Sequence, residues 1–356
     1  MQNLRIWKYL SLPWMVIALF FFISFIFLAF FKGTQIEYLT NDYLLGLFKN
    51  TFILSFLTAF ISALIAVPLA ILVTFYDFPG KKFFSWGLSL SIAFPAYVYA
   101  FIFVGIFEYA SPLSEYLRQI NINLPSIKNL FGASIIMSMA LFPYIFLLTK
   151  AQLSNVGVGI FKAAKSLGST NLSAIYKVIL PSLKPAIFAG MALVIFETVA
   201  DFGGVSTLRV ETFTVGIYDA WFGYQSYLPA ARLASYLLIF VFFIIFLSKY
   251  FGTKNSYLAS KTAENFEKIE LGNSKQYLLT TLCVSIFSIV FCIPLLQLIL
   301  WHFDNSTFSL FKNLNLIINS LFVAVCAAFI TVFIAMVLSL SYRGNKNLRS
   351  MIIISS

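Results

Sequence analysis

The sequence predicts an all-α membrane protein, a polytopic bundle of helices that cross a lipid bilayer. Of its 356 residues, 60% are hydrophobic and only 10% are charged, whereas a soluble domain is about half apolar and a quarter charged. Apolar runs of about 20 residues recur along the whole chain, and a helix needs that length to cross a hydrocarbon core about 30 Å thick. Together these observations exclude an ordinary water-soluble domain.

The apolar runs predict the following membrane spans, in chain order: 13–32, 50–76, 85–107, 132–149, 185–203, 231–249, 277–301 and 317–342, with a further run that begins at Met351. The first run is longer than the core of a signal peptide, and no small-residue cleavage site follows it. We therefore expect it to remain in the mature protein. Cys283, Cys292 and Cys326 all fall inside predicted spans. Cysteine behaves there as a small hydrophobic residue, so the sequence predicts no metal site or disulfide.

The formal net charge of +11 is explained by the membrane topology. A basic surplus can indicate nucleic-acid binding, but in a membrane protein it reflects basic loops on the cytoplasmic side. If the N-terminus is cytoplasmic, most of the 24 basic residues fall in inner segments. The sequence therefore predicts a multi-pass membrane protein with a cytoplasmic N-terminus that does not bind nucleic acid.

The chain also repeats itself at an offset of 269 residues, which separates Asn50 from Asn319. Transporters are often built from two such halves, although chance similarity between two apolar helices is an alternative. The repeat predicts a first permease half at 1–250, a cytoplasmic linker at 251–276 and the beginning of a second half at 277–356. Residue 356 corresponds to residue 87, which lies 269 residues earlier, so we expect the second half to be incomplete.

One predicted inner loop, residues 151–185, contains no acidic residue. Its pattern predicts two short helices with a turn between them. Gly168 suits the left-handed position that ends the first helix, and Pro181 is expected to end the second. The second helix can be capped by one of three neighbours, Ser169, Thr170 or Asn171. Helices this short need a partner to dock on, either lipid headgroups or the groove of another protein.

The spacing in this loop resembles a known motif. Ala163-Ala164, three residues, Gly168, nine residues and then Val178-x-Leu180-Pro181 is similar to the E-A-A-x3-G-x9-I-x-L-P loop of permeases from ATP-binding-cassette (ABC) importers. Lys162 replaces the glutamate of the motif and Val178 the isoleucine. In that family the loop sits in a cleft of the ATP-binding subunit. The resemblance implies an ATPase-coupling set of Lys162, Ala163, Ala164, Gly168, Val178, Leu180 and Pro181.

Three further segments resemble the fused iron(III) permeases within that family. They are Pro95-Ala96-Tyr97-Val98, Phe142-Pro143-Tyr144, and Glu197-Thr198-x-x-Asp201-Phe202-Gly203 with the following Thr212 to Phe222. The resemblance implies a type I importer transmembrane fold in the bacterial plasma membrane, with no cofactor. It also implies a dimer of ATP-binding subunits, an extracytoplasmic substrate-binding protein and a second permease piece or copy as partners. The sequence contains no G-x-x-x-x-G-K-[ST] motif, so we expect no enzymatic activity in this chain.

Glu197 is the acidic residue deepest inside a predicted span, and Asp201 follows four positions later on the same helical face. A carboxylate at membrane depth costs about 3 kcal/mol on insertion scales and faces the protein interior or a water-filled cavity. We therefore expect these two residues to line the outer part of a cation pathway. Alternatively, Glu197 bonds a neighbouring side chain and Asp201 caps the outer loop.

Tyr97, Tyr99 and Tyr109 raise the possibility of a phenolate iron site, but tyrosines near a membrane surface also serve as interfacial residues. For the whole chain, an iron(III) importer permease is the hypothesis that uses every motif. Two alternatives stay open: an ion-driven secondary transporter, and an ABC permease for thiamine, a polyamine or an inorganic anion. An intramembrane enzyme is disfavoured because the sequence has no H-E-x-x-H or G-x-S-x-G motif.

Overall fold

The computed structural model describes residues 40–154, 158–251, 272–304 and 314–344, together with scattered residues between 13 and 27. Within these ranges the protein is helical, and seven helices are long and apolar enough to cross a membrane. The all-α membrane fold is thereby confirmed. The predicted linker, apart from its ends, and the run from Met351 lie outside the described residues, as does half of the predicted span at 13–32.

The helices in chain order are α2 (Asn41–Phe75), α3 (Lys81–Gly87), the 3₁₀ helix η1 (Leu88–Ala93), α4 (Ala96–Phe107), α5 (Pro112–Gln119), α6 (Leu130–Gln152), α7 (Val158–Ser166), α8 (Asn171–Ala174), the π-helix η3 (Ile175–Ile179), α9 (Leu180–Ala200), α10 (Gly203–Thr207), α11 (Phe213–Tyr218), the π-helix η4 (Asp219–Gly223), α12 (Tyr227–Phe251), α13 (Asn273–Phe287), the π-helix η5 (Ser288–Cys292), α14 (Ile293–Asp304) and α15 (Leu314–Gly344). The chain forms two compact units, one from residue 34 to 300 and one from the two ends of the chain. In the second unit, α15 is a single 31-residue helix.

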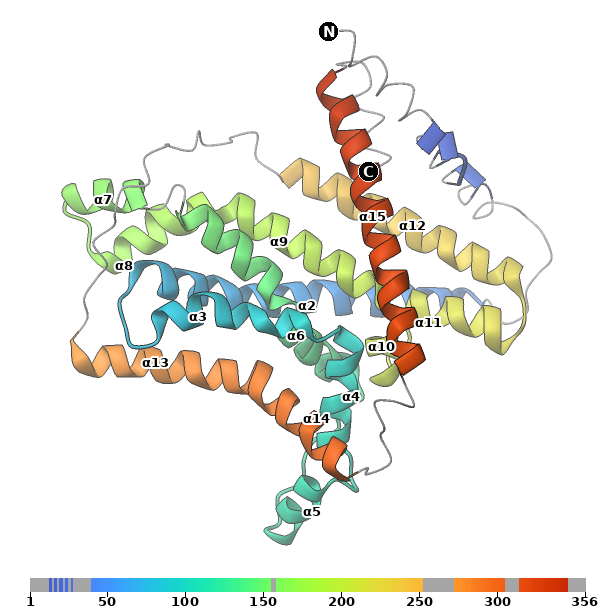
Figure 1. Cartoon of the computed structure of the whole chain (residues 1–356), viewed down its shortest axis with the longest axis horizontal. Helices are drawn as coiled ribbons and strands as arrows, with labels where there is room; N and C mark the ends of the chain where they lie inside the picture. The colour runs from blue at the N-terminus through green and yellow to red at the C-terminus, as the bar shows by residue number, and fades with distance from the viewer. Residues whose placement is uncertain are drawn as a thin grey trace. The chain divides into compact units, whose positions relative to one another are not determined.

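The centre of the first unit is formed by α2, α6 and α9, which run alongside one another (Figure 1). Small and hydroxyl side chains allow this close approach, as expected for helices packed within a membrane. On α2 the buried hydroxyl residues are Thr51, Ser55, Thr58 and Ser62. Ser62 Oγ donates to the carbonyl of Ser138 on α6 at 3.4 Å. Between α6 and α9, a Cβ atom at Gly190 would lie 2.8 Å from the Cα of Ile145. The core therefore depends on small residues as well as on large apolar ones.

The predicted span at 85–107 is wrong as a single helix. The segment begins as α3 and continues as the 3₁₀ helix η1. The helix is interrupted at Phe94 and Pro95, and α4 follows. Phe94 is extended, with φ −94° and ψ 121°, because the residue before a proline is pushed out of the helical region. The carbonyl of Pro95 then accepts from the N–H groups of Val98 and Tyr99, at 2.9 and 3.2 Å. This break directly precedes the candidate membrane span Ala96–Gln119.

The turn in the predicted inner loop is confirmed. Gly168 is left-handed, with φ +83°, and it closes α7: its own N–H donates to Lys165 at 2.9 Å, and the N–H of Ser169 donates to Ala164 at 3.1 Å. These two bonds form a Schellman motif. Of the three cap candidates, Thr170 takes the role, because its Oγ1 accepts from the N–H of Ser173 at 3.3 Å.

The expected stop at Pro181 is wrong. The helix continues from α8 through η3 into α9 and ends only at Ala200. Pro181 lies in the first turn of α9, directly after the π-helix. A proline within a helix removes one N–H donor and crowds the carbonyl four residues earlier. The wider turn at η3 provides space at that carbonyl, and residues 175–200 form one continuous span.

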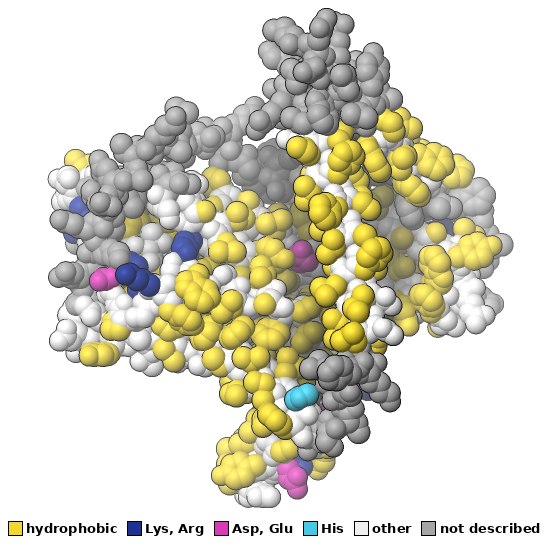
Figure 2. Space-filling model, viewed as in Figure 1, with side chains coloured by type: hydrophobic (Ala, Val, Ile, Leu, Met, Phe, Trp, Pro, Cys, Tyr) yellow, Lys and Arg dark blue, Asp and Glu magenta, His cyan; other side chains and the backbone are white. Residues whose placement is uncertain are grey.

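The segment from α13 to η5 packs against α3, η1 and α4. Thr280 Oγ1 donates to the carbonyl of Pro79 at 3.2 Å, and the rings of Phe83 and Phe287 meet at 5.1 Å. Tyr99, which is fully buried, donates its hydroxyl to the carbonyl of Val290 within η5. On the face that Figure 2 shows, the described surface is largely hydrophobic, and Lys and Arg side chains gather toward the end that carries α7 and α8.

Candidate functional site

A cavity of about 330 Å³ lies where the end of α9, the start of α4 and the middle of α6 meet. Its position follows from the break at Pro95, which exposes the first turn of α4 to the neighbouring helices. The lining residues are Ile92, Phe94, Pro95, Ala96, Tyr97, Ala140, Leu141, Tyr144, Glu197, Ala200, Asp201 and Phe202. Of these, four carry polar side chains, and all four present oxygen atoms. None of the described lining residues is Lys, Arg or His.

Glu197 lies in the last turn of α9, and its side chain is exposed. Tyr144 on α6 donates its hydroxyl to Glu197 Oε1 at 3.4 Å, a separation longer than the usual 2.5–3.0 Å for this kind of hydrogen bond. The carboxylate therefore reaches open space with one weak partner. This environment agrees with the expectation that an intramembrane carboxylate faces a cavity.

Asp201 lines the same cavity but has a second role at the end of α9. Its Oδ2 accepts from the N–H of Val205 in α10 at 3.0 Å, and its carbonyl accepts from Thr214 Oγ1 at 2.8 Å. Burial raises the pKa of Asp201 above its ordinary value, the N–H groups of Val205 and Gly204 partly offset this rise, and the charge of Glu197 adds to it. Asp201 thus holds the outer loop in place while it contributes charge to the cavity.

Two glycines allow α10 to lie directly on the start of α4. A Cβ atom at Gly203 would meet Tyr97 Cβ at 2.7 Å, and one at Gly204 would meet Asp201 Oδ2 at 2.7 Å. No side chain larger than hydrogen fits at either position without movement. The Gly-Gly pair therefore lets α10 pack against the start of α4, next to Asp201.

The structure separates the three tyrosines named from the sequence. Tyr97 lines the cavity and is 54% exposed. Tyr99 is buried against Val290 instead, and the guanidinium of Arg118 lies 3.8 Å above the ring of Tyr109. Sequence reasoning missed Tyr144 as a site residue. The only available signal was its place in the Phe142-Pro143-Tyr144 segment.

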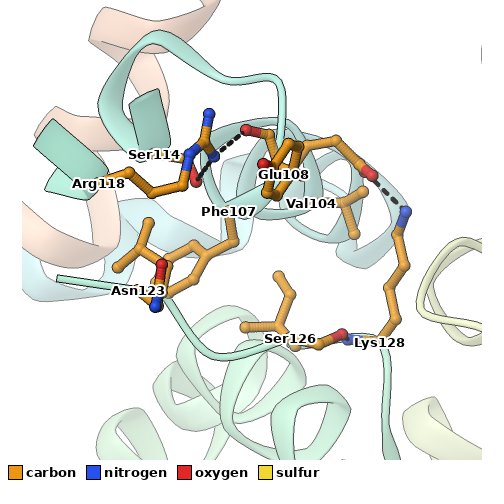
Figure 3. Close-up of a pocket in the computed structure, with 11 residues that line it drawn as sticks. Val104, Phe107, Glu108, Ser114, Arg118, Asn123, Ser126 and Lys128 are labelled. Carbon is orange, nitrogen blue, oxygen red and sulfur yellow. Dashed lines mark hydrogen bonds and ion pairs between the residues drawn. The ribbon is translucent and has the colours of Figure 1, made fainter. Parts of the chain in front are cut away.

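A second cavity, of about 360 Å³, lies between α4, α5 and the segment before α6 (Figure 3). Its charged groups are already paired, since Lys128 Nζ lies 2.6 Å from Glu108 Oε2 and Arg118 donates to the Tyr109 carbonyl and to Ser114 Oγ at 2.5 and 3.1 Å. No group of three or more His, Cys, Asp or Glu residues in the described ranges could hold a metal ion. The Glu197 carboxylate, in contrast, has one long hydrogen bond in the described structure, so the Glu197 cavity is the stronger candidate site.

The loop before α9 presents a different kind of surface. Phe161 and Ala164 point into the core, where Phe161 packs on Phe75 at 5.0 Å between ring centroids. Ala163 and Lys165 point outward, and Leu167 is 87% exposed. Of the remaining motif residues, Gly168 and Pro181 are exposed, and Val178 and Leu180 are partly buried. The side chain of Lys162 lies outside the described residues.

Residues 66–256, more than half of the chain, match the family described as the binding-protein-dependent transport system inner membrane component. The chain belongs to this family. The resemblance drawn from the loop motif is thereby confirmed, and the protein is a multi-pass component of the inner membrane. Family membership by itself does not specify which substrate crosses.

Two relatives with named substrates differ in what they transport. The sulfate transport system permease protein CysT of Salmonella typhimurium is 26% identical over 169 residues, covering 48% of this chain and 60% of the relative. The Fe(3+)-transport system permease protein FbpB 2 of Haemophilus influenzae is 25% identical over 269 residues, covering 75% of this chain and 50% of the relative. The chain thus spans half to three fifths of the length of these relatives. A solved bacterial ABC transporter for alginate aligns with 69% of the chain at 17% identity and a TM-score of 0.47.

Proposed function

We propose that this chain is the permease subunit of an ABC importer and that its substrate is iron(III). The observation that carries the proposal is the cavity at Glu197, where the polar side chains among the described lining residues are all carboxylates or phenols. Family membership supports the permease role. The cavity supports the choice of a cation.

The acidic lining argues against sulfate, the substrate named for one relative. Two unit charges about 4 Å apart interact by about 4 kcal/mol near a protein surface, so a dianion beside Glu197 would be repelled while a cation would be attracted. Hard oxygen ligands suit hard cations, and Tyr97 and Tyr144 add phenol oxygens to the two carboxylates. A sulfate path would instead need N–H or basic donors. Thiamine and polyamines are also cations, and the transport assay must separate them from iron.

Energy would enter through the loop at 151–185. In the proposed orientation the N-terminus and this loop are cytoplasmic, and a dimer of ATP-binding subunits contacts the exposed residues Ala163, Lys165 and Leu167. An extracytoplasmic binding protein would deliver the substrate at the opposite end, and a second permease piece or copy would complete the path. An ion-driven secondary transporter would leave the exposed surface at Leu167 without a partner.

The substrate is tested by separate uptake assays with radiolabelled iron(III), sulfate, thiamine and a polyamine in cells that express the chain with its ATPase and binding protein. We expect iron uptake, and we expect Glu197→Gln to lower it at least about tenfold at equal protein level, because the charge is lost while the shape is kept. Glu115→Gln on α5, a carboxylate that does not line the cavity, is the matched control. Sulfate uptake without iron uptake would overturn the substrate assignment.

The ATPase contact is tested by disulfide or maleimide crosslinking in the assembled complex. A cysteine at Leu167 should crosslink to the ATP-binding subunit, because this side chain is 87% exposed. A cysteine at Ala164, only 6% exposed, should not, although it lies in the same motif. Free access of reagents to Leu167→Cys in the intact complex, with no crosslink, would contradict the coupling role.

A further inference from the structure

We propose that Tyr144 contacts the transported ion directly, and that its phenol oxygen and Glu197 Oε1 form a transient two-oxygen site for a small, highly charged cation. This inference rests on the proposed function, because it assumes that a cation passes through the Glu197 cavity. It goes further than the proposed function because it assigns a ligand role to Tyr144 on α6, and this role would select among cations.

The geometry of the pair suits a shared ion. The two oxygens are 3.4 Å apart, too far for a strong hydrogen bond. Oxygen ligands of small hard cations lie at about 2.0–2.1 Å from the ion, so two adjacent ligands in an octahedral shell are about 2.9 Å apart. A closure of roughly half an ångström would bring Tyr144 and Glu197 to that separation. Glu197 is exposed and can move by this amount.

The position of Tyr144 on α6 is fixed by its neighbours. Phe142, Ile145 and Phe146 are each fully buried, and they hold the backbone of this turn in the core. Tyr144 is the residue of this turn that reaches the cavity. Its hydroxyl therefore stands at a set place opposite α9, as a ligand on a rigid element should.

The chemistry of the Tyr144 phenol explains why this side chain would favour cations of high charge. A carboxylate in place of Tyr144 would add a further insertion cost of about 3 kcal/mol, whereas a phenol is neutral while the cavity is empty. To bind as phenolate it must release its proton, here to water in the open cavity, and its ordinary pKa is about 10. Only a strongly polarising ion favours that loss near neutral pH. A trivalent ion would thus be held better than a monovalent or divalent one.

The test uses the purified complex with its ATPase, together with uptake in cells. Ferric citrate added to the wild-type complex should produce the visible charge-transfer absorption of an iron(III) phenolate. Tyr144→Phe should abolish this band and lower iron uptake about tenfold or more, while Tyr109→Phe, whose ring lies under Arg118 outside the cavity, should change neither. Equal thermal stability of the two variants would show that both are folded.

The outcomes are distinguishable. A Tyr144→Phe complex that keeps the band, or that transports iron as well as the wild type, overturns the ligand role. Loss of uptake with the band retained would mean that Tyr144 only positions Glu197, and it overturns the proposal too. A wild-type complex that imports iron but shows no charge-transfer band also overturns the ligand role of Tyr144. A wild-type complex that imports no iron is instead a failure of the proposed function itself.

Discussion

Replacing Gly190 by alanine tests how closely α6 and α9 must pack. In the structure an added Cβ atom would lie 2.8 Å from the Cα of Ile145, 3.0 Å from its Cγ1 and 3.2 Å from its Cβ. Carbon atoms pack best at about 3.5–4.0 Å. Because the nearest atom belongs to the backbone, a rotamer change cannot relieve the contact. The two helices must separate by roughly 1 Å.

The expected cost follows from two opposing terms. Overpacking a well-filled core costs about 1–3 kcal/mol, and a backbone clash belongs at the upper end of that range. Alanine in place of glycine within a helix stabilises the helix by about 1 kcal/mol. The net expectation for Gly190→Ala is a loss of about 1–2 kcal/mol, or several degrees in melting temperature. Under the proposed function, iron uptake should fall as well, because α6 and α9 carry two sides of the cavity.

Gly46 provides a matched control on α2. An added Cβ atom there meets nothing within 4 Å, so Gly46→Ala introduces no clash. The higher helix propensity of alanine is then the remaining effect, and Gly46→Ala should be neutral or slightly stabilising. Thermal unfolding of the two detergent-purified variants, followed by intrinsic fluorescence, measures the difference. The packing argument is refuted if Gly190→Ala is as stable as Gly46→Ala.

Three further predictions concern single contacts. Tyr99→Phe removes the donor to the Val290 carbonyl and should lower stability by about 0.6–1.7 kcal/mol in the same unfolding assay; an unchanged melting temperature would contradict this. Gly168→Ala should lower the free energy of unfolding by about 1 kcal/mol, because Gly168 has a left-handed backbone and an added Cβ atom would meet no other atom. Gly168→Asn should lower it less, because asparagine tolerates this conformation better. Equal losses in the two variants would argue against a backbone origin. Burial raises the pKa of Asp201, so this carboxyl ionises at lower pH in the unfolded chain than in the folded protein. Stability should therefore fall as the pH rises from the unfolded-state pKa through the folded-state pKa. Asp201→Asn should remove that fall in acid-range melting curves.

Much of the fold could be predicted from the sequence, because a membrane span needs only length and hydrophobicity. The turn at Gly168 was also predictable, since a left-handed residue and a capping hydroxyl are local features. The break at Phe94 and Pro95 was not recognised, because 85–107 is apolar throughout and hydropathy carries no information about backbone direction. The proline was visible, but prolines also occur inside continuous spans, as Pro143 does in α6.

The candidate site could be predicted only on one helix. Glu197 and Asp201 were placed together by their spacing of four residues, and the structure brings both to one cavity. Tyr144 lies on α6, and nothing in its local sequence shows that α6 faces the end of α9. Similarly, the motif fixed the place of Ala164 in the loop but not its inward direction, which depends on packing against the core.

The unexpected continuity of α9 bears most directly on mechanism. A helix that ended at Pro181 would leave a hinge between the loop and the membrane. Instead, Pro181 follows the π-helix η3 by two residues, and Pro294 follows η5 in the same way, so in both places a wider turn accommodates the proline within an unbroken span. From Pro181 to Glu197 the helix then extends about 24 Å. A displacement of the Gly168 turn by a bound ATPase would reach the Glu197 carboxylate through this helix as a rigid movement, and α10, held to Asp201 by the Val205 N–H, would move with it.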